Sequence, residues 1–330
     1  MTLSASQKSL ALWVLDHLVW FILLAVLLVF SLAIPGYGQW DIYKNVFYHA
    51  TFVGILAIGL AIALISGEID LSSESVLALS VVSTAFLTGL GTGASGLAMN
   101  GLLTLLIVLG VGVLAGLLNG MLVAIGKINS FIITLAGLLA YRALGLMLTE
   151  GRGISGLPEE VIWVARAYVG PIPVMVVVFI STYVAFHLFL TRTQFGRYIY
   201  LVGDSRVASR NAGIRIERVV IGVFIISGVL AAFGGWLLAA RTNGASPAIA
   251  TGILFEAFAA VVIGGVSLQG GRGSIPGIFA GAVLLSSIST AITLIGMPPT
   301  AINLVRAILI AVAVLLDALV LRIRPRLITD

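Results

Sequence analysis

The chain has 330 residues, of which 60% are hydrophobic and only 9% are charged. A soluble domain of this length needs a charged exterior, so the composition excludes one and indicates an integral membrane protein. The formal net charge of +5 gathers in loops and near the C-terminal end, which indicates contact with anionic lipid rather than nucleic acid. Because the sequence has no cysteine, disulfides and thiolate metal sites are excluded.

Apolar runs long enough to cross a bilayer recur along the whole chain. A spanning helix needs about 20 apolar residues, and the first run extends too far for a signal-peptide core, so we expect a retained first helix. The sequence predicts an all-α integral membrane fold, a single transmembrane domain over residues 1–330. We expect about ten crossings, at residues 11–34, 46–66, 72–91, 100–126, 131–149, 171–190, 217–240, 254–268, 275–296 and 302–321.

The basic residues predict which loops face the cytoplasm. With both termini inside, twelve Lys and Arg residues fall on the cytoplasmic side and four fall outside, in agreement with the positive-inside rule. The polar loop at 191–218 carries six of the cytoplasmic arginines. Its middle, residues 204–210, begins with the capping residue Asp204 and continues with small residues, which predicts a short surface helix. The alternative is a loop that only faces water and lipid headgroups.

An acidic stretch at 66–75 stands where hydropathy expects membrane or its edge. It contains Glu68, Asp70 and Glu74 among several serines, and carboxylates at such a depth are costly unless they meet water or a partner. Two interpretations are open. In one, Asp70 or Ser72 caps a helix after a simple cytoplasmic turn. In the other, a helix is broken at membrane depth and its polar side chains line a cavity.

The chain has no nucleotide-binding motif. Residues 91–96 match G-x-G-x-x-G but lie between apolar spans, with no preceding strand. Residues 120–127 resemble a phosphate loop, yet the glycine spacing is wrong and Ile128 stands where Ser or Thr is required. An energised process would therefore need a separate ATPase.

Small and charged residues inside the predicted spans indicate close helix packing. Gly112, Gly116 and Gly120 are four residues apart on one face of the fourth span, the small-xxx-small pattern. Arg142 lies inside the fifth span and must face the bundle, a cavity or a carboxylate. Glycine-bearing helices followed by similar turns at 126–129 and 296–299 indicate two weakly similar halves.

Four stretches in a fixed order carry a resemblance to a known family over nearly the whole chain. They are SGEIDLSSESV, INSFIITLAGLLAYRALG, FGRYIYLVGDSRVASRNAGI and EAFAAVVIGGVSLQGGRGSIPGIFAGA. Together they resemble the permease subunit of ribose-type monosaccharide ABC importers, the inner-membrane component of binding-protein-dependent transport.

That resemblance implies a fold related to the vitamin B12 importer permease and a place in the bacterial inner membrane. It implies no cofactor in this chain, a cytoplasmic ABC ATPase that holds ATP and Mg, a second permease subunit, identical or different, and a periplasmic sugar-binding protein. In the family a short helix of the cytoplasmic loop docks into the ATPase. The matching residues here are Gly203, Asp204, Ser205, Arg206, Val207, Ala208, Ser209 and Arg210.

The acidic stretch departs from the family pattern, which is usually Gly-Gly-Ile-Asp-Leu-Ser-x-Gly-Ser. Asp70 and Ser72 match, whereas Glu68 and Glu74 stand where glycine is common. Two added carboxylates would change what the pathway accepts.

The leading hypothesis is sugar translocation gated by a separate ATPase. Sugars are neutral and polyhydroxylated, so their path needs a few amide, hydroxyl and aromatic side chains rather than a cage of charge. Alternatives are a permease for branched-chain amino acids, a lone channel, and an intramembrane enzyme, for which neither H-E-x-x-H nor G-x-S-x-G is present. The candidate pathway residues are Glu68, Asp70, Ser72, Asn129, Phe131, Thr134, Asn243 and Gln269.

Overall fold

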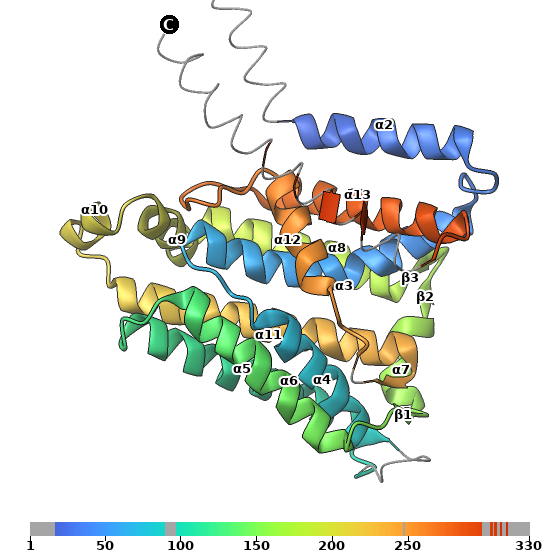
Figure 1. Ribbon diagram of the computed structural model, residues 1–330, viewed down its shortest axis with the longest axis horizontal. Helices are drawn as coiled ribbons and strands as arrows, with labels where there is room; N and C mark the ends of the chain where they lie inside the picture. The colour runs from blue at the N-terminus through green and yellow to red at the C-terminus, as the bar shows by residue number, and fades with distance from the viewer. Residues whose placement is uncertain are drawn as a thin grey trace, which may run out of the picture.

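The structure, a computed structural model, is built almost entirely from helices (Figure 1). It describes residues 17–89, 97–246 and 248–298, together with 304–305, 307–308, 311 and 315. The described helices are α2 (Leu18–Ala33), α3 (Trp40–Ile65), α4 (Ser73–Thr88), α5 (Gly101–Ala124), α6 (Ser130–Thr149), α7 (Glu159–Arg166), α8 (Val174–Arg192), α9 (Gln194–Asp204), α10 (Arg206–Asn211), α11 (Ile216–Thr242), α12 (Ile253–Ile263) and α13 (Ile275–Leu294).

Four two-residue strands form two short antiparallel ladders. β1 (Ile154–Ser155) pairs with β4 (Gly244–Ala245), and β2 (Tyr168–Val169) pairs with β3 (Ile172–Pro173). The first ladder joins the loop after α6 to the end of α11. Both lie at the end of the bundle opposite α9 and α10 (Figure 1).

Six of the described helices are long and apolar enough to span a membrane: α3, α5, α6, α8, α11 and α13. The chain is thus an all-α, multi-pass membrane protein. The shorter apolar helices α2, α4 and α12 have 16, 16 and 11 residues, and at 1.5 Å per residue α12 measures only about 16 Å. A crossing at 254–268 was predicted, but the helix there ends at Ile263. The predicted crossing at 302–321 and the glycine motif at 91–96 fall almost entirely outside the described residues.

The glycine face of α5 packs directly on α11. A Cβ added to Gly112 would lie 2.4 Å from the carbonyl oxygen of Gly228, and one added to Gly116 would lie 2.2 Å from that of Phe224. Gly120 meets Ile221 in the same way, at 2.8 Å from its Cα. The predicted small-xxx-small contact is confirmed, and it allows the two backbones to approach more closely than larger side chains would permit.

Buried and lipid-facing helices are clearly separated. In α3, 94% of the residues in an 18-residue apolar segment are buried, whereas the corresponding shares in α5 and α6 are 33% and 22%. The outer helices expose large apolar side chains, such as Leu114, Leu139 and Met147, as expected of surfaces that meet acyl chains. The core is therefore made by α3, α4, α11 and α13, and the polar side chains within it need partners.

Candidate functional site

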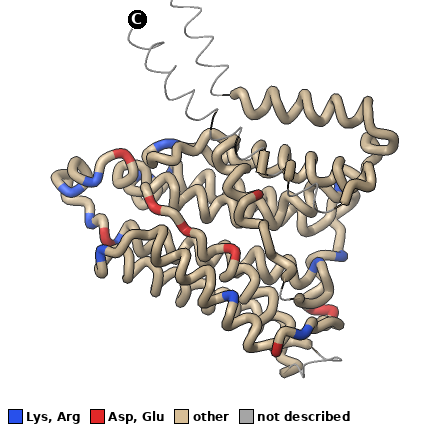
Figure 2. Tube along the Cα trace, in the orientation of Figure 1, with Lys and Arg blue, Asp and Glu red and all other residues tan. Residues whose placement is uncertain are grey.

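The acidic stretch forms an extended connection, residues 66–72, between α3 and α4. Gly67 has φ +80, so the chain can turn sharply after α3 ends at Ile65. The connection then enters the bundle, with Glu68, Asp70 and Ser72 exposed by 4%, 2% and 1%. Figure 2 shows the acidic positions following this connection through the interior. These side chains are enclosed by other helices, so the stretch is not a simple turn at the surface.

Contacts with α6 show how far the connection travels. The amide of Ile69 donates to Ser130 Oγ at 3.3 Å, at the first residue of α6. Glu74 pairs with Arg142, twelve residues further along that helix, which is about 18 Å. α4 therefore begins well inside the bundle, the broken arrangement of the second interpretation.

Asp70 organises the start of α4. One carboxylate oxygen accepts from the amide and the hydroxyl of Ser72, at 3.0 and 2.6 Å, and the other accepts from Ser227 Oγ of α11 at 2.6 Å. Ser72 Oγ also accepts from Asn119 of α5 at 2.8 Å. The N-cap residue of α4 is Ser72, which makes no side-chain cap bond, so neither predicted residue caps the helix through its side chain, and Asp70 instead holds Ser72 in place. All these groups are satisfied internally, which explains how a carboxylate is tolerated there.

Glu68 joins the connection to the cytoplasmic loop. Its carboxylate accepts from Arg206 Nη2 at 2.5 Å, with the Glu68 side chain 5% exposed and that of Arg206 52% exposed. The pair lies on the wall of a cavity of about 680 Å³ that we call the inner cavity. Its polar lining residues are Glu68, Lys127, Asn129, Ser130, Arg206, Arg210, Asn211 and Glu217.

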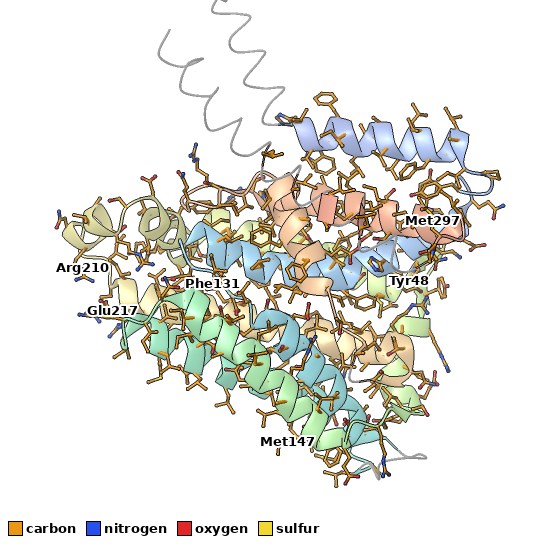
Figure 3. All side chains as sticks on the ribbon, viewed as in Figure 1. Tyr48, Phe131, Met147, Arg210, Glu217 and Met297 are labelled. Atoms are coloured by element: carbon orange, nitrogen blue, oxygen red, sulfur yellow. The ribbon has the colours of Figure 1, made fainter. Side chains whose placement is uncertain are left out.

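The predicted surface helix exists and is α10. Ser205, rather than Asp204, caps it, because Ser205 Oγ accepts from the amide of Ala208 at 3.2 Å. Val207 and Ala208 face outward, Val207 with 73% exposure, whereas Ser209 is buried. Figure 3 shows Arg210 and Glu217 of this region at one end of the molecule, opposite Tyr48 and Met297.

Gly203 fixes the end of α9 against the end of α3. A Cβ there would lie 1.8 Å from the carbonyl oxygen of Ile65 and 2.7 Å from the amide of Gly271. Tyr200, on the same helix, donates to the carbonyl of Gly273 at 3.0 Å, and burial raises the pKa of its phenol. Helix α9, which directly precedes α10, is thus packed tightly on the end of α3, so a movement of α10 would be transmitted to α3.

Glu74 makes the second ion pair of the acidic stretch. It accepts from Arg142 Nη2 at 2.8 Å, and its other oxygen accepts from the amides of Gly252 and Leu254, at 3.1 and 3.0 Å. These amides open α12, so the carboxylate sits at the positive end of a short helix inside the bundle. Arg142 was predicted to face the bundle, a cavity or a carboxylate, and its partner is the Glu74 carboxylate. It also donates to Thr251 Oγ1 at 3.4 Å.

A second cavity, of about 850 Å³, lies at the end of the molecule away from α10, and we call it the outer cavity. It is walled by the beginnings of α3 and α12 and the ends of α11 and α13. Sequence reasoning missed it, although α13 carries polar residues at 286, 289, 290 and 293 on one helical face, a signal that was available. Its polar and aromatic lining residues are Asn45, Tyr48, His49, Phe52, Arg241, Thr242, Thr251, Glu256, Ser289, Thr290 and Thr293.

The remaining predicted pathway residues do not come together. Asn129 caps α6 by accepting from the amide of Phe131 at 2.9 Å, and Thr134 donates to the carbonyl of Ser130 at 2.7 Å. Asn243 lies at the opposite end, where it accepts from the amide of Leu157 at 2.9 Å. Gln269 is exposed in the turn between α12 and α13. Of this set, only Asn129 lines one of the two cavities.

Comparison with known proteins places these features in a family. Residues 42–314 match the family described as "Branched-chain amino acid transport system / permease component". The chain belongs to this permease family. Its role is therefore transport rather than enzymatic catalysis, and the predicted resemblance to ribose-type ABC permeases is confirmed by individual relatives.

Relatives match the permease over most of their length. It is 30% identical to the ribose import permease protein RbsC of Escherichia coli K12 over 324 residues, 96% of this chain and 98% of the relative. It is 34% identical to the galactofuranose transporter permease protein YtfT of the same organism over 298 residues, 87% and 85% of the two chains. The autoinducer 2 import permease LsrC of Yersinia enterocolitica is 34% identical over 84% of this chain and 76% of the relative. No solved structure matches the chain significantly.

Proposed function

We propose that this permease is the membrane-spanning subunit of an ABC importer that carries a neutral sugar, a pentose, hexose or related polyol, across the bacterial inner membrane. The observation that carries the proposal is the nearly full-length match to permeases named for ribose and galactofuranose. The all-α bundle with six long apolar helices fits the same role.

Branched-chain amino acids are the second candidate, because the family description names them. A substrate carboxylate in a membrane transporter is typically met by the N-terminus of a broken helix. Here the N-terminus of α12 is already occupied by Glu74, which is also paired with Arg142. This helix end is therefore not open to a substrate carboxylate, which favours the sugar.

The energy source in this proposal is a separate cytoplasmic ATPase that binds ATP and Mg. It docks on α10, whose Arg206, Val207 and Ala208 are exposed. Gly203 and Ser209 of the predicted docking set face into this chain instead and hold α10 in place.

A series of contacts links α10 to helices inside the bundle. Arg206 is bonded to Glu68 at the start of the α3–α4 connection, and Glu74, just after its end, is bonded to the start of α12. Residues 251 and 253 at that start line the outer cavity. We infer that the connection couples α10 to the outer cavity, because packed and hydrogen-bonded elements of this kind carry coupling energy between sites.

The rest of the assembly follows from the same family. The proposal includes a second permease subunit, identical or different, and a sugar-binding protein that docks at the end bearing α7 and the two β-ladders. The proposal also includes cytoplasmic termini at both ends of the chain, about ten crossings and a fold related to the vitamin B12 importer permease. The arginines of α10 and of the loop after it support this orientation.

Reconstitution tests the proposal. Liposomes containing the permease, its ATPase and its binding protein should accumulate a neutral monosaccharide only when ATP is present on the ATPase side. Leucine uptake in place of sugar uptake would favour the second candidate. Sugar flux through the permease alone, without ATP, would overturn the ATPase-dependent mechanism.

A further inference from the structure

The outer cavity has the size and position of a small-molecule site. Its volume of about 850 Å³ lies within the roughly 300–1,000 Å³ typical of such sites. It is formed by four separate helices at the end of the bundle away from α10, where Figure 3 places Tyr48. A substrate arriving from that side would meet it before any part of the α3–α4 connection.

The chemistry of its wall is that of a hydroxyl-rich neutral ligand. Thr242, Ser289, Thr290 and Thr293 present hydroxyls, and Asn45 presents an amide. The hydroxyls of Thr242, Ser289 and Thr293 already donate their protons within the chain, to the carbonyl of Gly244, to Glu256 and to the carbonyl of Ser289, so they offer acceptor lone pairs to a ligand. The Thr290 hydroxyl and the Asn45 amide can both donate and accept, so the wall as a whole can meet the adjacent hydroxyls of a sugar. They come from three helices, α3, α11 and α13, which converge at this cavity.

Aromatic and charged residues in the wall support the same ligand class. Tyr48 and Phe52 offer apolar ring faces, and Arg241 lies over the Tyr48 ring with its guanidinium carbon 4.7 Å from the centroid. Glu256, the one carboxylate in the wall, accepts from Ser289 Oγ at 2.7 Å. One cation and one anion, each engaged with a neighbouring wall residue, give the lining little net charge, which disfavours an anionic or cationic ligand.

The inner side of the cavity is attached to the first turn of α4, directly after the α3–α4 connection, and to α6. Thr251, in the wall, accepts from Arg142 at 3.4 Å, and the neighbouring amides of Gly252 and Leu254 bond Glu74. A change in the connection would therefore move this wall.

We propose that the outer cavity is the site at which this permease receives its substrate, a neutral polyhydroxylated molecule such as a monosaccharide, through the hydroxyls of α13 and the aromatic rings of α3. The proposal rests on the sugar-import function and locates it in residues that the sequence motifs did not indicate.

Single cysteines test it directly, because the chain has none of its own. Thr290→Cys lies in the cavity wall, and Gln39→Cys, exposed in the loop before α3 and outside the lining, is the control. The assay uses the complete complex in whole cells and the neutral monosaccharide that the wild type is first found to import. A membrane-impermeant methanethiosulfonate reagent is added from outside. Should Thr290→Cys fail to accumulate, Thr293→Cys, one turn further along α13, replaces it.

We expect modification of Thr290→Cys to reduce uptake at least tenfold, and modification of Gln39→Cys to leave uptake at the wild-type rate. The imported sugar, supplied with its binding protein, should slow labelling of Thr290→Cys severalfold, and leucine should not. Unchanged uptake after complete labelling, or protection by leucine in place of sugar, overturns the proposal. If the wild type imports no neutral monosaccharide, the sugar-import function itself is wrong, so the two failures are distinguishable.

Discussion

Two carboxylates six positions apart, Glu68 and Glu74, form ion pairs of the same chemistry in different surroundings. Glu68 pairs with Arg206, which is 52% exposed on a short helix, while Glu74 pairs with Arg142, which is 33% exposed on a spanning helix. Glu74 also accepts hydrogen bonds from two backbone amides, whereas Arg206 is the one side-chain partner of Glu68 in the part of the chain that the structure describes.

The two ion pairs therefore differ in how easily they can break: we expect Glu74–Arg142 to stay fixed and Glu68–Arg206 to be movable. A carboxylate held by an arginine and a helix N-terminus inside the bundle is costly to release. The Glu68–Arg206 pair has a half-solvated arginine and lies beside the inner cavity, so it can be broken and remade in another geometry at a smaller cost. The stretch that connects them is thus anchored at α12 and adjustable at α10, as a part that transmits movement requires.

The largest effect is expected for Arg142→Leu. It leaves the Glu74 carboxylate buried without its counter-charge and should lower the free energy of unfolding by roughly 3 kcal/mol. Thermal unfolding of the purified permease would show a clearly lower Tm, with Arg152→Leu, from an exposed pair at 3.8 Å, as the unchanged control. Equal Tm values for the two variants would mean that Glu74–Arg142 is not an anchor.

Ala208→Trp should act on docking and not on folding. Ala208 is exposed on α10, so the permease should accumulate normally. A bulky side chain inserted in a close interface costs about 1–3 kcal/mol, which weakens ATPase co-purification roughly tenfold or more. Thr191→Trp, exposed but outside α10, controls for bulk. Normal ATPase binding and uptake by Ala208→Trp would remove α10 from the docking surface.

Arg206→Leu should separate coupling from stability. Arg206 is half exposed, and Glu68, although buried, lies on the wall of the inner cavity, where water can solvate its carboxylate once the arginine is gone. The loss of unfolding free energy should therefore be smaller than the roughly 3 kcal/mol expected for Arg142→Leu. Sugar uptake should nevertheless fall severalfold, since α10 loses its bond to the α3–α4 connection. Parallel measurements of Tm and of ATP-driven uptake would check this. A proportional fall in both would make the pair structural, like that of Glu74.

The smallest effect is expected for Arg210→Gln. Arg210 pairs with Glu217 at 3.1 Å, but both side chains are largely exposed, so the pair should contribute less than about 0.5 kcal/mol. Tm and membrane level should match the wild type. A fall in Tm as large as that of Arg142→Leu would show that side-chain exposure does not predict how much these ion pairs contribute to stability.

The sequence predicts well whatever depends on local pattern. The glycine face of α5, the surface helix at 206–211 and the need of Arg142 for a partner follow from spacing and from the cost of charge in a bilayer. The identity of the partner did not follow, because Glu74 and Arg142 are 68 positions apart and meet only when α4 packs on α6.

The outer cavity was missed for a related reason. Its polar residues are spread over four helices, and each looks like an isolated polar side chain in an apolar run. The predicted pathway residues were chosen near motifs and turns, where Asn129 and Asn243 satisfy local amides instead. Half-length helices such as α12 also escape a hydropathy scan, which reads an apolar 11-residue helix and the turn after it as one crossing.

Tethering Glu68 to Arg206 measures the central claim most directly. A double variant, Glu68→Cys with Arg206→Cys in the cysteine-free chain, is joined by a short, reducible bis-methanethiosulfonate linker in liposomes that contain the ATPase and binding protein. If α10 drives the α3–α4 connection by changing this joint, the linker should abolish ATP-driven sugar uptake while the ATPase stays bound, and reduction should restore uptake to the level of the unlinked double variant. Undiminished uptake with the linker in place would contradict the account.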